Sequence, residues 1–410
     1  MKLSIVIVNY NVRHYIVQCL DSVSRAIKTL RTEGHDADVY VVDNHSKDDS
    51  VEYLKQHCPD IHLTASIHNL GFSKANNIAI RESKGEYVLL LNPDTVIGEH
   101  TLSKIIAYAD ENPQMGGMGV KMLAADGTKA PESRRGLPTP MVSLYKILGL
   151  CKRFPDHPRF ARYYMSNMPW DEAGEIDICS GAFLLMRCEA LNKVGLLDED
   201  FFMYGEDIDL SYRIQKGGWK NIYYPETILH YKGESTHHSS FRYVHVFYQA
   251  MLIFYRKHFR SAWWLALPVR LAIYAKAFIA LIMILISWLR DVIGMRKRNK
   301  GSKINYLFIG TQESLEKCRH HAHINDLSAK FIEGTQELMP LGHHDALRNE
   351  AIETGRNTET CVVYDVSQFT YEHVLTLFAN NPLPHCIMGF YHPDIDTIIT
   401  PYEIFEGSIR

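Results

Sequence analysis

The chain has 410 residues, of which 46% are hydrophobic and 22% are charged, and its formal net charge is −3. This length predicts two or three folded domains, and the near-neutral charge excludes a broad basic surface that would recruit nucleic acid. The eight cysteines form no CxxC pair and no dense cluster, which argues against a disulfide framework or a zinc site and favours a reducing cytosol. Met1 and Lys2 lead directly into a short apolar run, so we expect no signal peptide and a cytoplasmic N-terminal domain.

Two strand-helix units open the chain. Residues 3–8 (LSIVIV) form a continuous apolar run followed by a helical pattern, and residues 39–42 repeat this arrangement. Such units predict a doubly wound sheet that binds its ligand at the carboxyl ends of the strands, where Asn9 and Asp43 stand. The first strand has no glycine-rich turn after it, which excludes a dinucleotide fingerprint and leaves a mononucleotide. Asp43 would touch that ligand or cap the following helix.

The next strand predicts a second carboxylate at the same edge. The stretch NLGFSKANN at residues 69–77 predicts a glycine turn into a helix with amide side chains on the ligand side. Residues 87–91 (YVLLL) predict a buried strand that stops at Pro93, because proline removes a donor and restricts the residue before it. Asp94 is therefore presented at the strand end, where it caps the next helix or holds a divalent cation against phosphate oxygens.

Residues 125–175 show little periodicity and contain several prolines and basic residues, including Arg134 and Arg135. A long irregular segment inside a regular domain is typical of a functional lid or binding loop. Its arginines would meet an anionic acceptor or a diphosphate, or they are solvated surface charge. Residues 178–186 (ICSGAFLLM) then predict a strand whose small residues around Gly181 let a ligand approach the backbone.

The stretch FFMYGEDIDLSYR at residues 201–213 carries Glu206, Asp207 and Asp209 directly after Gly205. The apolar spacing predicts a helix that begins near Glu206 and ends at Gly217. Three carboxylates within four residues repel one another and need compensation. They are acids stabilised by a helix start, or Asp207 is a general base at the mouth of a site.

Seven motifs occur in a consistent order along the first part of the chain. They are LSIVIVNYN, VVDNHS, NLGFSKANN, LLNPDT, CSGAFLLMR, GLLDEDFFMYGEDIDLSYR and LHYKGEST. In order and rough spacing, residues 1–240 resemble the family 2 glycosyltransferases, and most of all the branch that includes bacterial rhamnosyltransferases of cell-surface polysaccharide synthesis. The resemblance implies an α/β fold with a GT-A doubly wound mixed sheet.

The resemblance also implies roles for individual residues. Asp94 would ligate a Mg2+ or Mn2+ ion that bridges the donor diphosphate, His230 would be the second protein ligand, and Asp207 would deprotonate the acceptor hydroxyl. Asn9 and Asp43 would hold the base and ribose of the nucleotide. The full set expected to bind substrate is Asn9, Asp43, Gly71, Lys74, Asn76, Asn92, Gly181 and Glu206. Asn92 departs from the family pattern, because it stands where the first carboxylate of the DxD motif is usual.

The implied activity is an inverting transfer of a sugar from a nucleotide-sugar to a lipid-linked or polysaccharide acceptor. Deoxythymidine diphosphate rhamnose is the donor that the resemblance favours, and a UDP-sugar is the next. A cation at the leaving diphosphate and a carboxylate at the acceptor suit such a displacement, in which negative charge grows on the leaving group. Two other hypotheses stay open: a catalytically silent scaffold that binds nucleotide-sugars, and a nucleotidyltransferase that releases pyrophosphate.

Three domains are expected: residues 1–260, an apolar segment at 261–300, and a small Rossmann-like α/β domain at 301–410. Residues 271–289 approach the ~20 apolar residues that cross a bilayer, but basic residues flank them on both sides, which disfavours a single crossing. We expect a helix or short hairpin on the cytoplasmic leaflet, with a buried inter-domain helix as the alternative. The protein would then lie peripherally on the inner face of the plasma membrane.

The last domain shows three apolar runs, at residues 304–310, 361–366 and 385–391, with helical patterns around Leu315 and Val374. Its histidines lack carboxylates or cysteines at matching spacing, which disfavours a metal site. The family resemblance stops before this domain, so an interaction or regulatory module is the default expectation.

Overall fold

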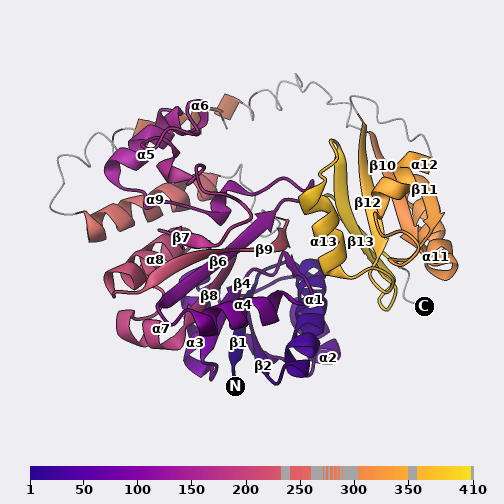
Figure 1. The fold of residues 1–410 in the computed structure, drawn as a ribbon, viewed down its shortest axis with the longest axis horizontal. Coiled ribbons are helices and arrows are strands. Elements are labelled where there is room, and N and C mark those ends of the chain that lie inside the picture. The colour runs from indigo at the N-terminus through magenta and orange to yellow at the C-terminus, as the bar shows by residue number, and fades with distance from the viewer. Residues whose placement is uncertain are drawn as a thin grey trace.

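A computed structural model describes residues 1–231, 241–259, 303–349 and 358–407, with isolated helical positions between 271 and 289 (Figure 1). Most of the predicted membrane segment and the end of the last family motif therefore lie outside the described residues. The boundaries expected at 260 and 300 stay predictions. No helix within the described ranges is both long enough and apolar enough to cross a bilayer.

The first sheet has mixed strand directions, as expected for the fold class. Its strand order is β3-β2-β1-β4-β8-β6-β9-β5, with β7 paired to β9. Strands β1, β2, β3 and β4 run parallel to one another, whereas β8 is antiparallel to β4 and β6. The strands are β1 (Leu3–Asn9), β2 (Ala37–Asp43), β3 (His62–Ala65), β4 (Tyr87–Leu91), β5 (Thr95–Ile97), β6 (Met115–Leu123), β7 (Gly174–Ile176), β8 (Phe183–Arg187) and β9 (Lys220–His230).

Helices cover both faces of this sheet. The alternation of β1 places Ile5 and Ile7 in one apolar cluster with α1, and Val6 and Val8 in another with α3, which explains why the strand is continuously apolar. The α-helices are α1 (Arg13–Thr32), α2 (Ser50–His57), α3 (Phe72–Glu82), α4 (Thr101–Glu111), α5 (Pro140–Ile147), α6 (Leu150–Arg153), α7 (Cys188–Val194), α8 (Glu206–Lys216) and α9 (Phe241–His258).

Two features of this sheet differ from the sequence interpretation. Strand β6 was not expected, because its glycines hide it. A Cβ on Gly116 would lie 2.6 Å from the Trp219 Cβ, so glycine permits the close packing of β6 here. In addition, the sequence patterns above name no strand at β9, which runs unbroken through Pro225 with a shift of its register against β6. The irregular segment at 125–175 also contains α5 and α6.

The C-terminal domain carries a separate six-stranded sheet in the order β11-β10-β12-β13-β14-β15. The three predicted strands and two predicted helices are confirmed. The strands are β10 (Lys303–Gly310), β11 (Ser328–Glu333), β12 (Thr358–Asp365), β13 (Cys386–His392), β14 (Thr397–Ile399) and β15 (Ile404–Glu406). The α-helices are α11 (Gln312–Ile324), α12 (His343–Asn349) and α13 (Tyr371–Asn380). Helix α13 lies at the junction of the two sheets and contacts β5 and β9 (Figure 1).

Histidines of the C-terminal domain have structural partners. His321 Nε2 lies 3.0 Å from Asp396 Oδ1, and His343 Nδ1 lies 2.8 Å from the Tyr364 hydroxyl. No group of three metal-ligating side chains occurs among the described residues.

Candidate active site

The ends of β1 and β2 bring Asn9 and Asp43 together. The two residues are paired in the sheet register, and both are buried. Asn9 Nδ2 donates to Asp43 Oδ2 at 2.9 Å, and Asp43 Oδ1 accepts from the Ser46 amide. Helix α2 begins at Ser50, with Asp49 at its N-cap, so Asp43 does not cap it. The buried Asn9 Oδ1 has no hydrogen-bond partner, which leaves an acceptor for a ligand.

Asp94 and His230 also meet at the sheet edge. Thr95 pairs with His230 between β5 and β9, and the Tyr231 amide donates to the Asp94 carbonyl at 3.0 Å. This backbone pairing brings His230 Nε2 to 3.4 Å from Asp94 Oδ1. Helix α4 begins at Thr101, so the alternative that Asp94 caps it is wrong.

The Asp94–His230 pair fits a divalent cation. Asp94 Oδ1 is buried without a hydrogen-bond donor, and so is the second ring nitrogen of His230. One carboxylate oxygen and one imidazole nitrogen form a donor set compatible with Mg2+ or Mn2+. The remaining ligands would be water and diphosphate oxygens. Asn92 Nδ2 lies 3.4 Å from His230 Nε2, beside this pair.

Asp207 lies in the first turn of α8, after Gly205 at φ 84°. Its Oδ2 forms an ion pair with Arg135 Nη2 and accepts from the Gly181 amide at 3.2 Å. The Ile208 amide donates to Oδ1 at 2.8 Å. The Arg135 and Asp207 side chains are only 16% and 12% exposed, so the pair lies in the wall of the site.

The other two carboxylates of the cluster have different environments. Burial and the charge of Asp207 raise the pKa of Glu206 to about 8, which favours its protonated form. Asp209 is bound by Arg213 at 2.7 Å and by His258 at 2.6 Å, which makes it structural. The three acids therefore differ: Glu206 favours its protonated form, Asp207 is paired with Arg135, and Asp209 is held in a buried ion pair.

A cavity of about 490 Å3 opens over Glu206 and Asp207 between α5, α6, α8 and α9. Aromatic side chains line part of its wall, namely Tyr163, Tyr164, Tyr204, Phe247 and Tyr255. Cationic side chains line it as well, namely Arg135, Lys146 and Lys152. An aromatic wall with lysines and a carboxylate suits a partly apolar, anionic ligand that carries a hydroxyl.

Short connections join this cavity to the Asp94–His230 pair. Gly181 contacts Asp207, and the carbonyl of the next residue, Ala182, accepts from the Asn92 amide at 3.0 Å. A Cβ on Gly181 would lie 3.4 Å from the Asp207 Cβ. Asp94 and His230 do not line the cavity itself, and the described residues connect them to Asp207 through these backbone contacts of Gly181, Ala182 and Asn92.

The remaining predicted residues lie on or before α3. Gly71 has φ 81°, and a Cβ there would stand 2.4 Å from the Phe202 carbonyl oxygen. Asn76 Nδ2 donates to the Phe72 carbonyl at 2.9 Å, and Lys74 is exposed. Gly71 and Asn76 thus have structural explanations, and a substrate role for all three stays a prediction.

Arg135 is the residue that sequence reasoning did not place. Solvated surface charge, one of the two interpretations of the arginines in its segment, is wrong for Arg134 and Arg135. Arg134 is buried, with its guanidinium carbon 3.6 Å from the centre of the Trp170 ring. The acidic cluster was the available signal, because a buried carboxylate needs a nearby cation.

The chain is similar to an N-acetylglucosaminyl-diphospho-decaprenol L-rhamnosyltransferase of Mycobacterium tuberculosis, with 29% identity over 280 residues that cover 65% of this chain and 88% of the relative. It is similar to the rhamnosyltransferase WbbL of Escherichia coli, with 26% identity over 219 residues, 50% of this chain and 76% of the relative. The crystal structure of TarS 1–349 from S. aureus gives a TM-score of 0.40 and 20% identity over 62% of this chain, and the match spans 65% of that structure, just under two thirds.

A family model described as glycosyltransferase like family 2 matches residues 2–266, which include both strand-end pairs and the acidic cluster of α8. The resemblance to rhamnosyltransferases in the first 240 residues is thereby confirmed. The chain belongs to glycosyltransferase family 2.

Proposed function

We propose that the chain is an inverting, metal-dependent glycosyltransferase that moves a sugar from a nucleotide-sugar to a lipid-linked acceptor in cell-surface glycan synthesis. The donor is deoxythymidine diphosphate rhamnose, with a UDP-sugar as the alternative. The similarity to two rhamnosyltransferases supports this choice of sugar. The site residues stay those named above, with Asn9 and Asp43 at the nucleotide.

The observation that carries the proposal is the arrangement of Asp207 and the Asp94–His230 pair along one sheet edge, joined through Gly181 and Asn92. Asp207 would accept the proton of the acceptor hydroxyl while that oxygen bonds to the anomeric carbon. The bond from this carbon to the diphosphate would break on the opposite side, and the nucleoside diphosphate would leave with the electron pair. A single displacement of this kind inverts the anomeric centre. A bound cation would supply charge stabilisation at the leaving oxygens.

The aromatic cavity supports a diphosphate-linked lipid acceptor over a free polysaccharide. Lys146 and Lys152 would meet the diphosphate, and the apolar wall formed with Ile147 and Met251 would contact the first part of the lipid. The mycobacterial relative is named for an acceptor of this class. Lys152 is exposed, and the half-buried Lys146 lies over the Tyr163 ring; both line the cavity.

Exposed apolar side chains support a place on the cytoplasmic membrane face. Met141, Leu148 and Phe154 are 45%, 63% and 43% exposed around α5 and α6, next to the cavity. The described helical positions between 271 and 289 also expose large apolar side chains, among them Leu271, Phe278 and Met283. Isolated exposed apolar residues are ordinary, but repeated ones beside an acceptor cavity fit a lipid surface.

Donor turnover tests the proposal. Purified full chain is incubated with each nucleotide-sugar and Mn2+, and released nucleoside diphosphate is measured, followed by NMR of the product anomer. The Asp207→Asn variant should lose at least ~100-fold in turnover, which is the lower range for general-base catalysis, and should keep its nucleotide-induced thermal shift. Asp171→Asn, an exposed acid paired with Lys121, is the control and should keep turnover. Pyrophosphate as the product would indicate a nucleotidyltransferase instead.

The ion pair between Arg135 and Asp207 favours a second candidate, a silent nucleotide-sugar-binding scaffold, because the guanidinium occupies a carboxylate oxygen that would accept the proton. Both partners nevertheless line the cavity, so an acceptor can reach them. Nucleotide binding with no turnover of any donor, in the presence of a diphosphate-linked acceptor, would support the scaffold.

A further inference from the structure

We propose that the C-terminal domain is a brace that holds the Asp94–His230 pair and the loop after β1 in position. This inference rests on the proposed function, because the proposed function assigns the metal and nucleotide sites that the C-terminal domain would hold in position. The domain would thereby be part of the catalytic unit, in place of the independent interaction module expected from the sequence.

The first contact involves the segment that follows Asp94. Five residues after Asp94, the Glu99 carboxylate accepts from the backbone amides of Tyr371 and Glu372 at 3.0 and 2.9 Å. These amides open α13 and lack partners within that helix, so an anion there is favourable. A Cβ on Gly98 would lie 3.0 Å from the Glu372 Cβ, which leaves no gap between the segments. The N-terminus of α13 therefore fixes the end of β5.

The second contact involves the residue after His230. Tyr231 is buried, and its ring packs against that of Tyr15, with 5.0 Å between ring centroids. The Tyr15 hydroxyl donates to the Thr400 carbonyl in the C-terminal domain at 3.0 Å. Both tyrosines belong to one apolar cluster with Phe369, Tyr371 and other residues of that domain. Movement of the C-terminal domain would therefore displace the end of β9.

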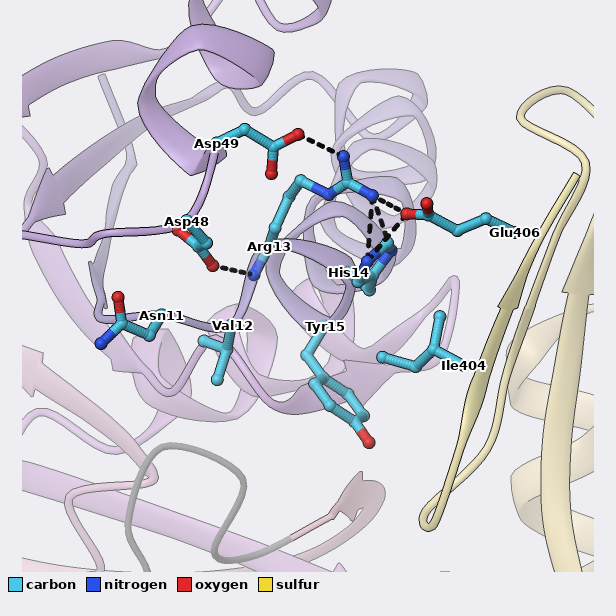
Figure 2. A pocket seen from close by; sticks show the side chains of 9 residues that line it. All are labelled: Asn11, Val12, Arg13, His14, Tyr15, Asp48, Asp49, Ile404 and Glu406. Atoms are coloured by element: carbon cyan, nitrogen blue, oxygen red, sulfur yellow. Dashed lines mark hydrogen bonds and ion pairs between the residues drawn. The ribbon is translucent and has the colours of Figure 1, made fainter. Parts of the chain in front are cut away.

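The third contact reaches the loop after β1. Arg13, four residues after Asn9, forms ion pairs with Asp49 at 2.5 Å and with Glu406 of β15 (Figure 2). Its amide donates to Asp48 at 3.2 Å, and His14 Nε2 lies 2.9 Å from Glu406 Oε1. Burial and the Arg13 charge lower the pKa of His14 to about 4, so Arg13 carries the positive charge of this contact at neutral pH.

Further polar contacts join the domains behind these loops. The buried Tyr371 hydroxyl donates to Asp21 Oδ2 of α1 at 2.8 Å, and Arg25 Nη1 donates to the Val366 carbonyl at 2.7 Å. The Met388 amide donates to the Ala125 carbonyl at 2.8 Å. Buried polar bonds combined with a shared apolar cluster are typical of a permanent interface.

The experiment compares two tyrosine variants of the full chain by hydrogen-deuterium exchange without ligand. Tyr371→Phe removes a hydroxyl bond that crosses between the domains, whereas Tyr391→Phe removes an equally buried bond to Asp396 inside the C-terminal domain. Exchange in β5 and the end of β9 should be roughly fivefold faster in Tyr371→Phe than in Tyr391→Phe, the ratio that corresponds to about 1 kcal/mol for one hydrogen bond. Glu99→Gln is a second cross-domain variant and should act in the same direction.

Equal exchange of these strands in Tyr371→Phe and Tyr391→Phe, together with no effect of Glu99→Gln, would overturn the brace. The apparent affinity for Mn2+ in the presence of UDP or deoxythymidine diphosphate is the second readout, and it should weaken several-fold in Tyr371→Phe but not in Tyr391→Phe. If the wild-type chain binds no Mn2+ while exchange is still faster in Tyr371→Phe than in Tyr391→Phe, the result would count against the proposed function and leave the brace supported.

Discussion

The guanidinium of Arg135 and the carboxylate of Asp207 form an ion pair in the wall of the aromatic cavity, although 72 residues separate them in the chain. Burial lowers the pKa of Arg135 and the Asp207 charge raises it, with a net upward shift that keeps the guanidinium charged. Each of these two largely buried charges is therefore stabilised by the other. An acceptor hydroxyl that approaches Asp207 must do so beside this arginine.

Removal of Arg135 should destabilise the protein strongly. Arg135→Ala leaves the Asp207 carboxylate partly buried without its cation, and breaking such a pair costs about 3–5 kcal/mol. Chemical unfolding monitored by circular dichroism measures the change. Arg135→Lys is the matched control, because it keeps the charge and should lose less. A loss below ~1 kcal/mol in Arg135→Ala, the range of exposed pairs, would mean that solvent screens the carboxylate.

The stability that Glu206 contributes to the protein should be lost as the pH rises from 5 to 9. Its pKa is raised from 4.5 to about 8 in the folded protein, so the folded state binds more protons than the unfolded state in this window. The stabilising contribution is complete below the unfolded pKa and is lost as the pH rises through the folded one. Glu206→Gln removes this pH-dependent contribution to the free energy of unfolding. Relative to the wild type, the free energy of unfolding of the variant should therefore rise by more than ~1 kcal/mol between pH 5 and pH 9. Denaturant unfolding at pH 5, 7 and 9 measures the free energy of unfolding of both proteins. The same pH dependence in the wild type and in Glu206→Gln would contradict the prediction.

Asp94→Asn should abolish stabilisation by Mn2+ and a nucleoside diphosphate with little cost to the free protein, because Asp94 Oδ1 has no hydrogen-bond donor to lose. In the wild type, ligand at 100 times its Kd raises stability by about 2.7 kcal/mol. Thermal-shift titrations measure the effect. Asp43→Asn is the comparison and should weaken nucleotide binding with and without Mn2+. An Asp94→Asn variant with full Mn2+ dependence would place the cation elsewhere.

Gly71→Ala should destabilise the protein more than Gly149→Ala. Both glycines have positive φ, 81° and 75°, but the added Cβ meets the Phe202 carbonyl oxygen at 2.4 Å in the first case and nothing within 4 Å in the second. The conformational cost alone is roughly 1 kcal/mol. Gly71→Ala should exceed it, because the chain before α8 must move. Paired unfolding measurements provide the test, and equal losses would show that the 202–205 loop adapts freely.

Lys152→Gln should weaken binding of the acceptor and leave hydrolysis of the donor unchanged. Lys152 lines the cavity, whereas the neighbouring Arg153 does not, so Arg153→Gln is the matched control. With a diphosphate-linked lipid acceptor, KM should rise roughly tenfold or more in Lys152→Gln alone, since one charge-assisted contact contributes roughly 1.5–3 kcal/mol. Donor hydrolysis without acceptor should be equal in both variants. Equal acceptor KM values would remove Lys152 from the acceptor site.

The sequence by itself determined which residues stand at the strand ends. Apolar runs with β-branched residues define β1, β2 and β4, and the polar residues that follow them, Asn9, Asp43 and Asp94, must lie at one edge because parallel strands end together. The start and end of α8 were equally readable, because Gly205 and Gly217 flank it. These features are local, so the pattern of neighbouring side chains is sufficient to predict them.

Only the tertiary structure decided which distant groups meet. Arg135 lies in a segment without periodicity, so its pairing with Asp207 depends on how that segment folds over α8. Strand β6 could not be predicted from its sequence, because its glycines are required by the close packing of Trp219, and this contact leaves no local sequence pattern. The contact of Glu99 with α13 likewise joins residues more than 270 positions apart. Local sequence patterns record periodicity and burial, whereas pairing between segments depends on the complementary shape and charge of the whole fold.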